Sequence, residues 1–204
     1  MRLGALILAG GHSIRMGRPK ELLPFGDSTL LARICTTLRD CAAPVVVVAR
    51  DASQPLPTLP PAVERLHDER RAAGPLAALV LGLRHLVQNH RFAAGDAAVL
   101  TACDLPFLSA GFVRGLAELL PGHCLVMPRA DGFLHPLAAV YDVAVLAVAE
   151  ARLADGAGTP RVLAERADAR FVDGDDLARI DPERRCLRNL NTPADYARAL
   201  AESE

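Results

Sequence analysis

The chain has 204 residues, of which 51% are apolar and 23% are charged. Its length favours one folded domain, and its apolar share excludes an intrinsically disordered chain. The formal net charge of −1 argues against a general nucleic-acid or membrane partner, and no apolar run has the length of about 20 residues that crosses a bilayer.

Short apolar runs alternate with segments of helical periodicity along most of the chain. We expect strands at residues 3–9, 44–49, 63–66, 97–102, 124–127, 137–141 and 170–172. We expect helices at residues 28–41, 75–90, 109–120, 143–153, 160–167 and 193–201, and loops at 10–26 and 51–61. This alternation predicts a doubly wound, mainly parallel sheet, which binds ligands outside the carboxyl ends of its strands.

The opening segment Met1–Gly11 has the apolar character of a short signal peptide, but a buried first strand explains it better. The five cysteines include no Cys-x-x-Cys pair, which argues against a disulfide framework and a zinc site. The six histidines show no spacing typical of metal ligands. These features favour the reducing cytoplasm as the location.

Lysine and asparagine are rare in this chain. The 23 basic residues are 22 arginines and one lysine, Lys20. The three asparagines are Asn89, Asn189 and Asn191. Because the sequence uses arginine wherever arginine suffices, the one lysine indicates a site that needs a compact ammonium group.

The first candidate site follows the first predicted strand directly. It has the sequence Leu8-Ala9-Gly10-Gly11-His12-Ser13-Ile14-Arg15-Met16-Gly17-Arg18-Pro19-Lys20. This is neither a dinucleotide fingerprint nor a Walker loop. The paired glycines allow backbone N–H groups to approach an anion, while Arg15 and Lys20 add positive charge. The pattern predicts a polyphosphate site, and a solvated turn with incidental basic residues is the alternative.

The motif Leu-Ala-Gly-Gly-x-Ser-x-Arg-Met-Gly-x-x-Lys resembles the signature of the molybdenum cofactor nucleotidyltransferases, within the nucleoside-triphosphate transferase superfamily. Later segments agree in order, namely Leu22–Gly26, Gly74–Ala77, Cys103–Leu108, His135–Leu137 and Asn189–Asp195. The resemblance covers nearly the whole chain. It implies a Rossmann-like three-layer α/β/α sandwich of the nucleotide-diphospho-sugar transferase type, with residues 1–121 as the nucleotide-binding half and 122–204 as the acceptor-side half.

The resemblance also implies roles for individual residues. Those that would bind the nucleotide are Leu8, Ala9, Gly10, Gly11, Lys20, Asp68 and Asp104. Those assigned to catalysis are Lys20, Arg15 and Asp104. The implied ligands of Mg²⁺, a hard cation that takes oxygen ligands, are Asp104 and Asn191.

Several of these residues also have purely structural interpretations. Asp104 could form a turn before Leu105-Pro106, and Asp68 could belong to a solvated charge cluster. Asn189 is a turn residue or a substrate contact. The asparagine that the family uses near the second strand is absent, because this chain has Arg50 and Asp51 there.

The implied reaction joins GMP from GTP to the terminal phosphate of molybdenum-bearing molybdopterin and releases pyrophosphate. Leu-Ala-Gly-Gly favours GTP, whereas the cytidylyl members resemble Leu-Ala-Ala-Gly. The alternatives are a CTP-dependent enzyme, transfer to another sugar or alcohol phosphate, and a non-enzymatic nucleotide-binding protein. Molybdenum-insertion or molybdoenzyme chaperone proteins are expected as further partners.

Overall fold

The computed structural model of the chain describes residues 1–10, 18–67 and 74–202. Its larger sheet consists of β1 Leu3–Leu8, β4 Val45–Ala49, β5 Val63–His67, β6 Ala97–Ala102, β7 Leu125–Ala130, β8 Phe133–Leu134, β9 Ala138–Asp142 and β10 Ala169–Val172. The strand order is β10-β7-β9-β6-β1-β4-β5, with β8 paired to β7. A separate two-stranded hairpin consists of β2 Pro24–Phe25 and β3 Ser28–Thr29.

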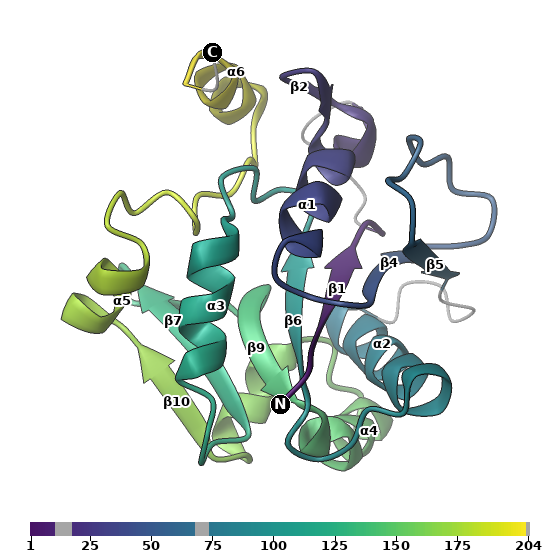
Figure 1. Ribbon diagram of the computed structural model, residues 1–204, viewed down its shortest axis with the longest axis vertical. Coiled ribbons are helices and arrows are strands. Elements are labelled where there is room, and N and C mark those ends of the chain that lie inside the picture. Colours follow the sequence, from purple (N-terminus) through teal and green to yellow (C-terminus); the bar gives the residue numbers. More distant parts are fainter. Residues whose placement is uncertain (11–17, 68–73, 203–204) are drawn as a thin grey trace.

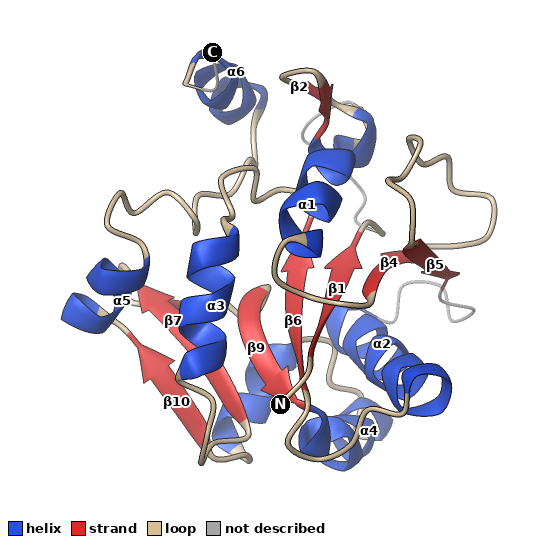
Figure 2. Cartoon of the chain, in the orientation of Figure 1, coloured by secondary structure: helices blue, strands red, loops and turns tan. Residues whose placement is uncertain are grey.

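The sheet is parallel except around β9 and at the short strand β8. β1 is parallel to β4 and β6, and β10 is parallel to β7, whereas β9 is antiparallel to both β6 and β7. Figure 2 shows the arrows of β1, β6, β7 and β10 pointing the same way, opposite to that of β9. Leu8 is in register with Val48 and Ala102, so the carboxyl ends of β1, β4 and β6 meet. We call this side of the sheet the carboxyl edge and the opposite side the amino edge.

The helices cover both faces of the sheet. They are α1 Leu30–Arg39, α2 Gly74–His90, α3 Ala110–Glu118, α4 Leu146–Ala154, α5 Gly174–Ile180 and α6 Pro193–Ala201. Short 3₁₀ helices occur at η2 Lys20–Leu22, η3 Val143–Val145 and η4 Pro160–Glu165. The apolar sides of α1 and α3 bury one face (Figure 1), and those of α2 and α4 bury the other. The result is the expected three-layer α/β/α arrangement.

A third, smaller apolar cluster holds α6 against the segment that follows β1. It contains Leu23, Phe25, Leu30, Leu190 and Ala199. The hydroxyl of Tyr196 in α6 also donates a hydrogen bond to the carbonyl of Pro24. The chain that leads into α6 is therefore anchored at the carboxyl edge.

Most of the predicted elements are confirmed. Ser109 and Thr192 cap α3 and α6 as N-cap residues do, since their side chains accept hydrogen bonds from Phe112 and Asp195 N–H groups. The helix predicted at 160–167 is present at Pro160–Glu165, as a 3₁₀ helix that ends two residues earlier. Three further elements were not predicted from the sequence, namely α5, β8 and the β2–β3 hairpin. Within the described residues, no helix has the length and apolar character needed to cross a membrane.

Candidate active site

A lysine and an aspartate from distant parts of the chain meet at the carboxyl edge. Asp104 follows β6 by two residues, and Lys20 begins η2. The Lys20 Nζ atom lies 3.3 Å from Asp104 Oδ2, with side chains 15% and 23% exposed. The Cys103 N–H donates to the Leu8 carbonyl at 3.4 Å, which joins the end of β1 to the same place. The predicted meeting of the loop after β1 with residue 104 is confirmed.

Lys20 owes its position to its buried neighbour Glu21. The Glu21 side chain is 2% exposed and accepts a hydrogen bond from Gln54 Nε2 at 2.6 Å. The Leu23 N–H donates to the Lys20 carbonyl at 3.1 Å, which closes the turn of η2. With Glu21 held inside, the backbone of η2 is fixed while the lysine ammonium reaches the partly exposed carboxylate.

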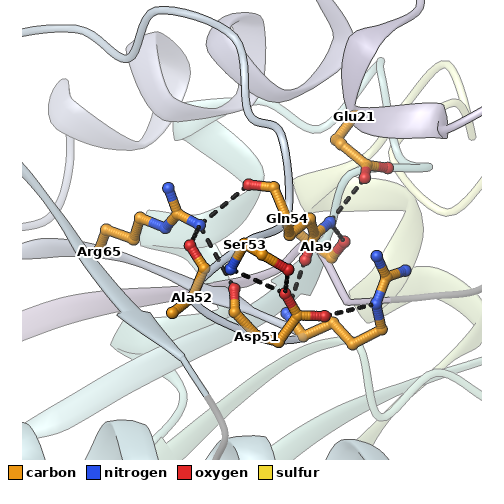
Figure 3. A network of polar contacts seen from close by, with 8 residues as sticks. Ala9, Glu21, Asp51, Ala52, Ser53, Gln54 and Arg65 are labelled. Carbon is orange, nitrogen blue, oxygen red and sulfur yellow. Dashed lines mark hydrogen bonds and ion pairs between the residues drawn. The ribbon is translucent and has the colours of Figure 1, made fainter.

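Gln54 is the centre of a buried polar network (Figure 3). Its amide nitrogen donates both to Glu21 and, at 2.7 Å, to the carbonyl of Ala9. Its amide oxygen accepts a hydrogen bond from the Arg50 N–H at 2.6 Å. One side chain thus joins the segment after β1, the start of η2 and the end of β4. A buried amide with all these partners stabilises a single arrangement of the three segments.

The loop that carries Gln54 is held by side chains instead of regular secondary structure. Asp51 accepts hydrogen bonds from the Ser53 hydroxyl and from Arg50 Nε, which lower the pKa of its carboxyl to about 2. Arg65 Nη2 donates to the carbonyls of Asp51, Ala52 and Gln54 at 3.3, 3.0 and 2.9 Å (Figure 3). In this structure Arg50 and Asp51 take part in ordering the loop beside the site.

Gly10 lies where two segments of the backbone approach each other closely. A Cβ atom at this position would lie 3.2 Å from Arg50 Cα and 3.3 Å from Arg50 N. Few side-chain-bearing residues have such tight contacts with backbone atoms, so the glycine is explained by packing as well as by access to a ligand. Ala9, which precedes it, is fully buried.

The segment before α6 is connected directly to the candidate metal ligand. The Leu190 N–H donates to the Asp104 carbonyl at 2.9 Å, and Asn191 is the next residue. The Asn191 N–H donates to Asp195 Oδ2 at 3.2 Å, beside the Thr192–Asp195 capping box, and Asn191 itself is exposed. Asp104 and Asn191 thus belong to two segments joined by a backbone hydrogen bond, and carboxylate and amide oxygens are ligands that a hard divalent cation takes, so the residue types present fit the implied Mg²⁺.

Comparison with known proteins agrees with this geometry. A family model described as the MobA-like NTP transferase domain matches residues 5–170. The chain belongs to this family. A relative from Mycobacterium avium, named "Probable molybdenum cofactor guanylyltransferase", is 35% identical over 206 residues, covering 100% of this chain and 97% of the relative. A relative of the same name from Carboxydothermus hydrogenoformans is 30% identical over 198 residues, covering 97% of this chain and 95% of the relative.

Solved structures show the same fold. The molybdopterin-guanine dinucleotide biosynthesis protein A of Archaeoglobus fulgidus superposes with a TM-score of 0.78 at 22% identity, covering 98% of this chain and 97% of that one. The 2-C-methyl-D-erythritol 4-phosphate cytidylyltransferase of Thermus thermophilus superposes with a TM-score of 0.68 at 21% identity, covering 100% and 99%. The chain is thus a MobA-like nucleotidyltransferase with the nucleotide-diphospho-sugar transferase fold.

The structure places some of the predicted site residues of this nucleotidyltransferase and not others. Gly11, Arg15 and Asp68 lie outside the described residues. Glu21 and Gln54 position the site from inside and were not predicted from the sequence. A glutamine within a proline-rich loop was the available signal, but nothing in the local sequence indicates its partners.

A second feature lies at the carboxyl ends of β7 and β10. It is a cavity of about 440 Å³, and its charged or titratable lining includes Arg129, His135, Asp173, Arg184 and Arg188. Arg129 pairs with Asp173 and Arg188 with Glu202, whereas Arg184 makes no ion pair with any other described residue. Burial lowers the pKa of His135, so its imidazole is neutral at neutral pH. The cavity therefore offers a neutral ring and a guanidinium that makes no ion pair within the described part of the chain.

Proposed function

We propose that the chain transfers GMP from GTP to the terminal phosphate of molybdenum-bearing molybdopterin, which forms the guanine dinucleotide cofactor and releases pyrophosphate. The observation that carries this proposal is the approach of Lys20 Nζ to Asp104 at 3.3 Å, beside the end of β1. The names of the relatives from Mycobacterium avium and Carboxydothermus hydrogenoformans support the guanylyl specificity. The motif Leu-Ala-Gly-Gly supports GTP over CTP.

In the proposed reaction an oxygen of the acceptor phosphate forms a bond to the α-phosphorus of GTP. The bond from that phosphorus to the oxygen bridging the β-phosphate breaks, and pyrophosphate leaves. Gly10, Gly11 and Arg15 would hold the triphosphate, and Lys20 would neutralise charge that develops on the α- and β-phosphates. No general base is needed, because the attacking phosphate is already ionised.

Asp104 and Asn191 are the residues that would hold Mg²⁺. When bound, the cation supplies charge neutralisation to the phosphates. Lys20 already contacts Asp104, so the same carboxylate orients the ammonium group for the nucleotide. Asp68 is proposed as a contact of the nucleotide.

The acceptor is proposed to occupy the cavity at the ends of β7 and β10. Arg184 would bind an acceptor phosphate, since its guanidinium makes no ion pair within the described part of the chain. On this proposal residues 1–121 bind the nucleotide, and residues 122–204 supply the acceptor-side lining. Delivery of the product to a molybdoenzyme chaperone remains a prediction.

The direct test is pyrophosphate release by the purified chain with molybdopterin and each of GTP, CTP and ATP. We expect release with GTP and Mg²⁺ only when molybdopterin is present. Faster release with CTP would assign the cytidylyl reaction. Release with a sugar or alcohol phosphate but not with molybdopterin would assign another acceptor, and tight GTP binding without release with any acceptor would contradict an enzyme.

A further inference from the structure

Two histidines and a glutamate converge between the strand β5 and the C-terminal end of α2, away from Asp104. His85 Nε2 lies 2.6 Å from Glu64 Oε2, and His90 Nε2 lies 2.9 Å from Glu64 Oε1. The three potential ligand atoms lie within 4.8 Å of one another. The spacing of the histidines in the sequence does not indicate this cluster, because its third member, Glu64, is remote in sequence from His85 and His90.

The fold explains why these side chains meet. Glu64 lies two residues before Leu66 on β5, so both side chains point to the face of the sheet that α2 covers. His85 and His90 lie in the last turns of α2, which runs back toward the amino edge (Figure 1). The His90 carbonyl accepts a hydrogen bond from Arg2 Nη1 at 2.9 Å, which places this end of α2 beside the start of β1. The cluster thus joins the edge strand β5 to α2.

The cluster has an unsatisfied ligand atom at its centre. His90 Nε2 is buried and, despite its closeness to Glu64, has no hydrogen bond of acceptable geometry. His85 is oriented from behind, since its Nδ1 lies 2.8 Å from the side-chain amide of Asn89. In this arrangement Asn89 Nδ2 donates to His85 Nδ1, so the ring proton lies on Nε2, toward Glu64. With the Asn89 amide turned over, its oxygen accepts the Nδ1 proton instead and Nε2 is free to face an ion, as in a metal-binding histidine.

We propose that Glu64, His85 and His90 bind a divalent transition-metal ion, Zn²⁺ by preference, as a clamp between β5 and α2. Two imidazoles and one carboxylate are a common protein ligand set for zinc, whereas Mg²⁺ prefers oxygen alone. Zinc bond lengths require about 3.3 Å between ligand atoms around a tetrahedral ion. The present separations of 2.6 and 2.9 Å would open by about 0.7 and 0.4 Å to reach that distance.

The test is titration of the metal-free, full-length chain with Zn²⁺ under competition with a chelating dye. We expect one tight site in the wild-type chain and at least about 100-fold weaker binding in Glu64→Gln, His85→Gln and His90→Gln, since even outer partners of a ligand contribute about 10–100-fold. Asn89→Ala should weaken binding by about 10-fold. Zinc should also raise the melting temperature of the wild-type chain and not those of the ligand variants.

Two controls separate this site from other zinc ligands. His123 pairs with Asp168 at 3.3 Å without a third ligand among the described residues, so His123→Gln should bind zinc like the wild type. Asp104→Asn should do so too, which keeps the result independent of the proposed reaction. Co²⁺ should give the visible bands of a tetrahedral site without thiolate bands, although the chain has five cysteines. Thiolate bands, wild-type affinity in the three ligand variants, or no tight binding by the wild type would each overturn the proposal.

Discussion

An ion pair lies at each end of the two central strands, β1 and β6, and the two pairs are built differently. At the amino edge, Arg2 precedes β1 and Asp96 precedes β6, with 2.6 Å between Arg2 Nη2 and Asp96 Oδ2. At the carboxyl edge, Lys20 and Asp104 follow the same strands and approach to 3.3 Å. The same two strands thus carry one ion pair at their amino ends and another at their carboxyl ends, and the two pairs have different roles.

At the amino edge, the Asp96 carboxylate accepts several hydrogen bonds from other groups of the protein. Asp96 accepts from Arg2 N, Nε and Nη2 at 2.8, 3.1 and 2.6 Å, and from the Ala93 N–H at 3.2 Å. At the carboxyl edge, Lys20 is the one described residue whose side chain contacts the Asp104 carboxylate. A carboxylate with several fixed donors stabilises the fold, whereas one with a single distant donor retains lone pairs for a ligand.

The largest difference between the two pairs should appear in activity. We expect Lys20→Ala and Asp104→Asn each to reduce kcat/KM for pyrophosphate release by about 10²–10³-fold, because each removes a preorganised charge from the reacting phosphates. The melting temperature should change less than the activity, because the pair is partly exposed to solvent. Arg2→Ala is the matched control and should retain wild-type turnover at a temperature where it is folded. Near-normal activity in either carboxyl-edge variant would remove the assigned roles.

The next largest effect concerns Gln54, which binds Glu21, the buried neighbour of Lys20. Gln54→Ala removes the bonds to Ala9, Glu21 and Arg50 and leaves their buried polar groups without partners. We expect a loss of about 2–3 kcal/mol in the free energy of unfolding, measured by urea denaturation, since each unsatisfied buried group costs about 1–3 kcal/mol. Activity should fall as well, because η2 carries Lys20.

Gln88→Ala provides the control, because Gln88 lies exposed on α2. Its effect should stay within about 0.5 kcal/mol, as is usual for surface substitutions. Equal losses in the free energy of unfolding of Gln54→Ala and Gln88→Ala would show that the buried network does not hold the carboxyl edge together.

The sequence predicts the fold well because most of its elements carry strong local patterns. Residues 97–102 and 193–201 form β6 and α6 with the predicted bounds, since an unbroken apolar run and a Thr-Pro cap define them. The seven-residue helix α5 has only two large apolar residues, Leu177 and Ile180, on its core side, which are too few for periodicity to reveal it. At residues 160–165 the pattern indicates a helix but cannot distinguish 3₁₀ from α geometry.

The candidate site is predictable only where it is local in sequence. The loop after β1 and Asp104 follow predicted strands, so the parallel topology alone brings Lys20 to the aspartate. Gln54 and Glu21 are 33 residues apart, and no sequence period relates them. Their pairing depends on the path of a loop without regular structure, which hydrogen bonds from Arg65 hold in place.

A smaller perturbation of the carboxyl edge is Gly10→Ala. The added methyl group would press on Arg50 Cα and N, which are backbone atoms that cannot rotate away. We expect a destabilisation of about 1–2 kcal/mol, within the range for overpacking, together with a higher KM for GTP. Gly111→Ala in α3 is the contrast, because its new Cβ would have only Ser109 Oγ nearby, at 3.9 Å. That variant should be more stable by about 0.5–1 kcal/mol, and an equal gain at Gly10 would show that the close approach carries no constraint.

The smallest expected effect is at the amino edge and depends on pH. Hydrogen bonds from Arg2 lower the pKa of Asp96 from its ordinary value of 3.8 to about 2. Asp96→Asn should reduce the free energy of unfolding at pH 7 by up to about 1 kcal/mol, because the Arg2 side chain is half exposed and solvent screens the pair. A depressed folded-state pKa contributes stability that is complete above the unfolded value and lost as the pH falls through the folded value. The difference in the free energy of unfolding between the wild type and Asp96→Asn should therefore be constant from pH 7 to about pH 4 and shrink toward pH 2. Urea denaturation at each pH would measure it. A difference that grew on acidification would mean that Asp96 is stabilised in its protonated form, and the contrast between the two ends of β1 and β6 would not hold.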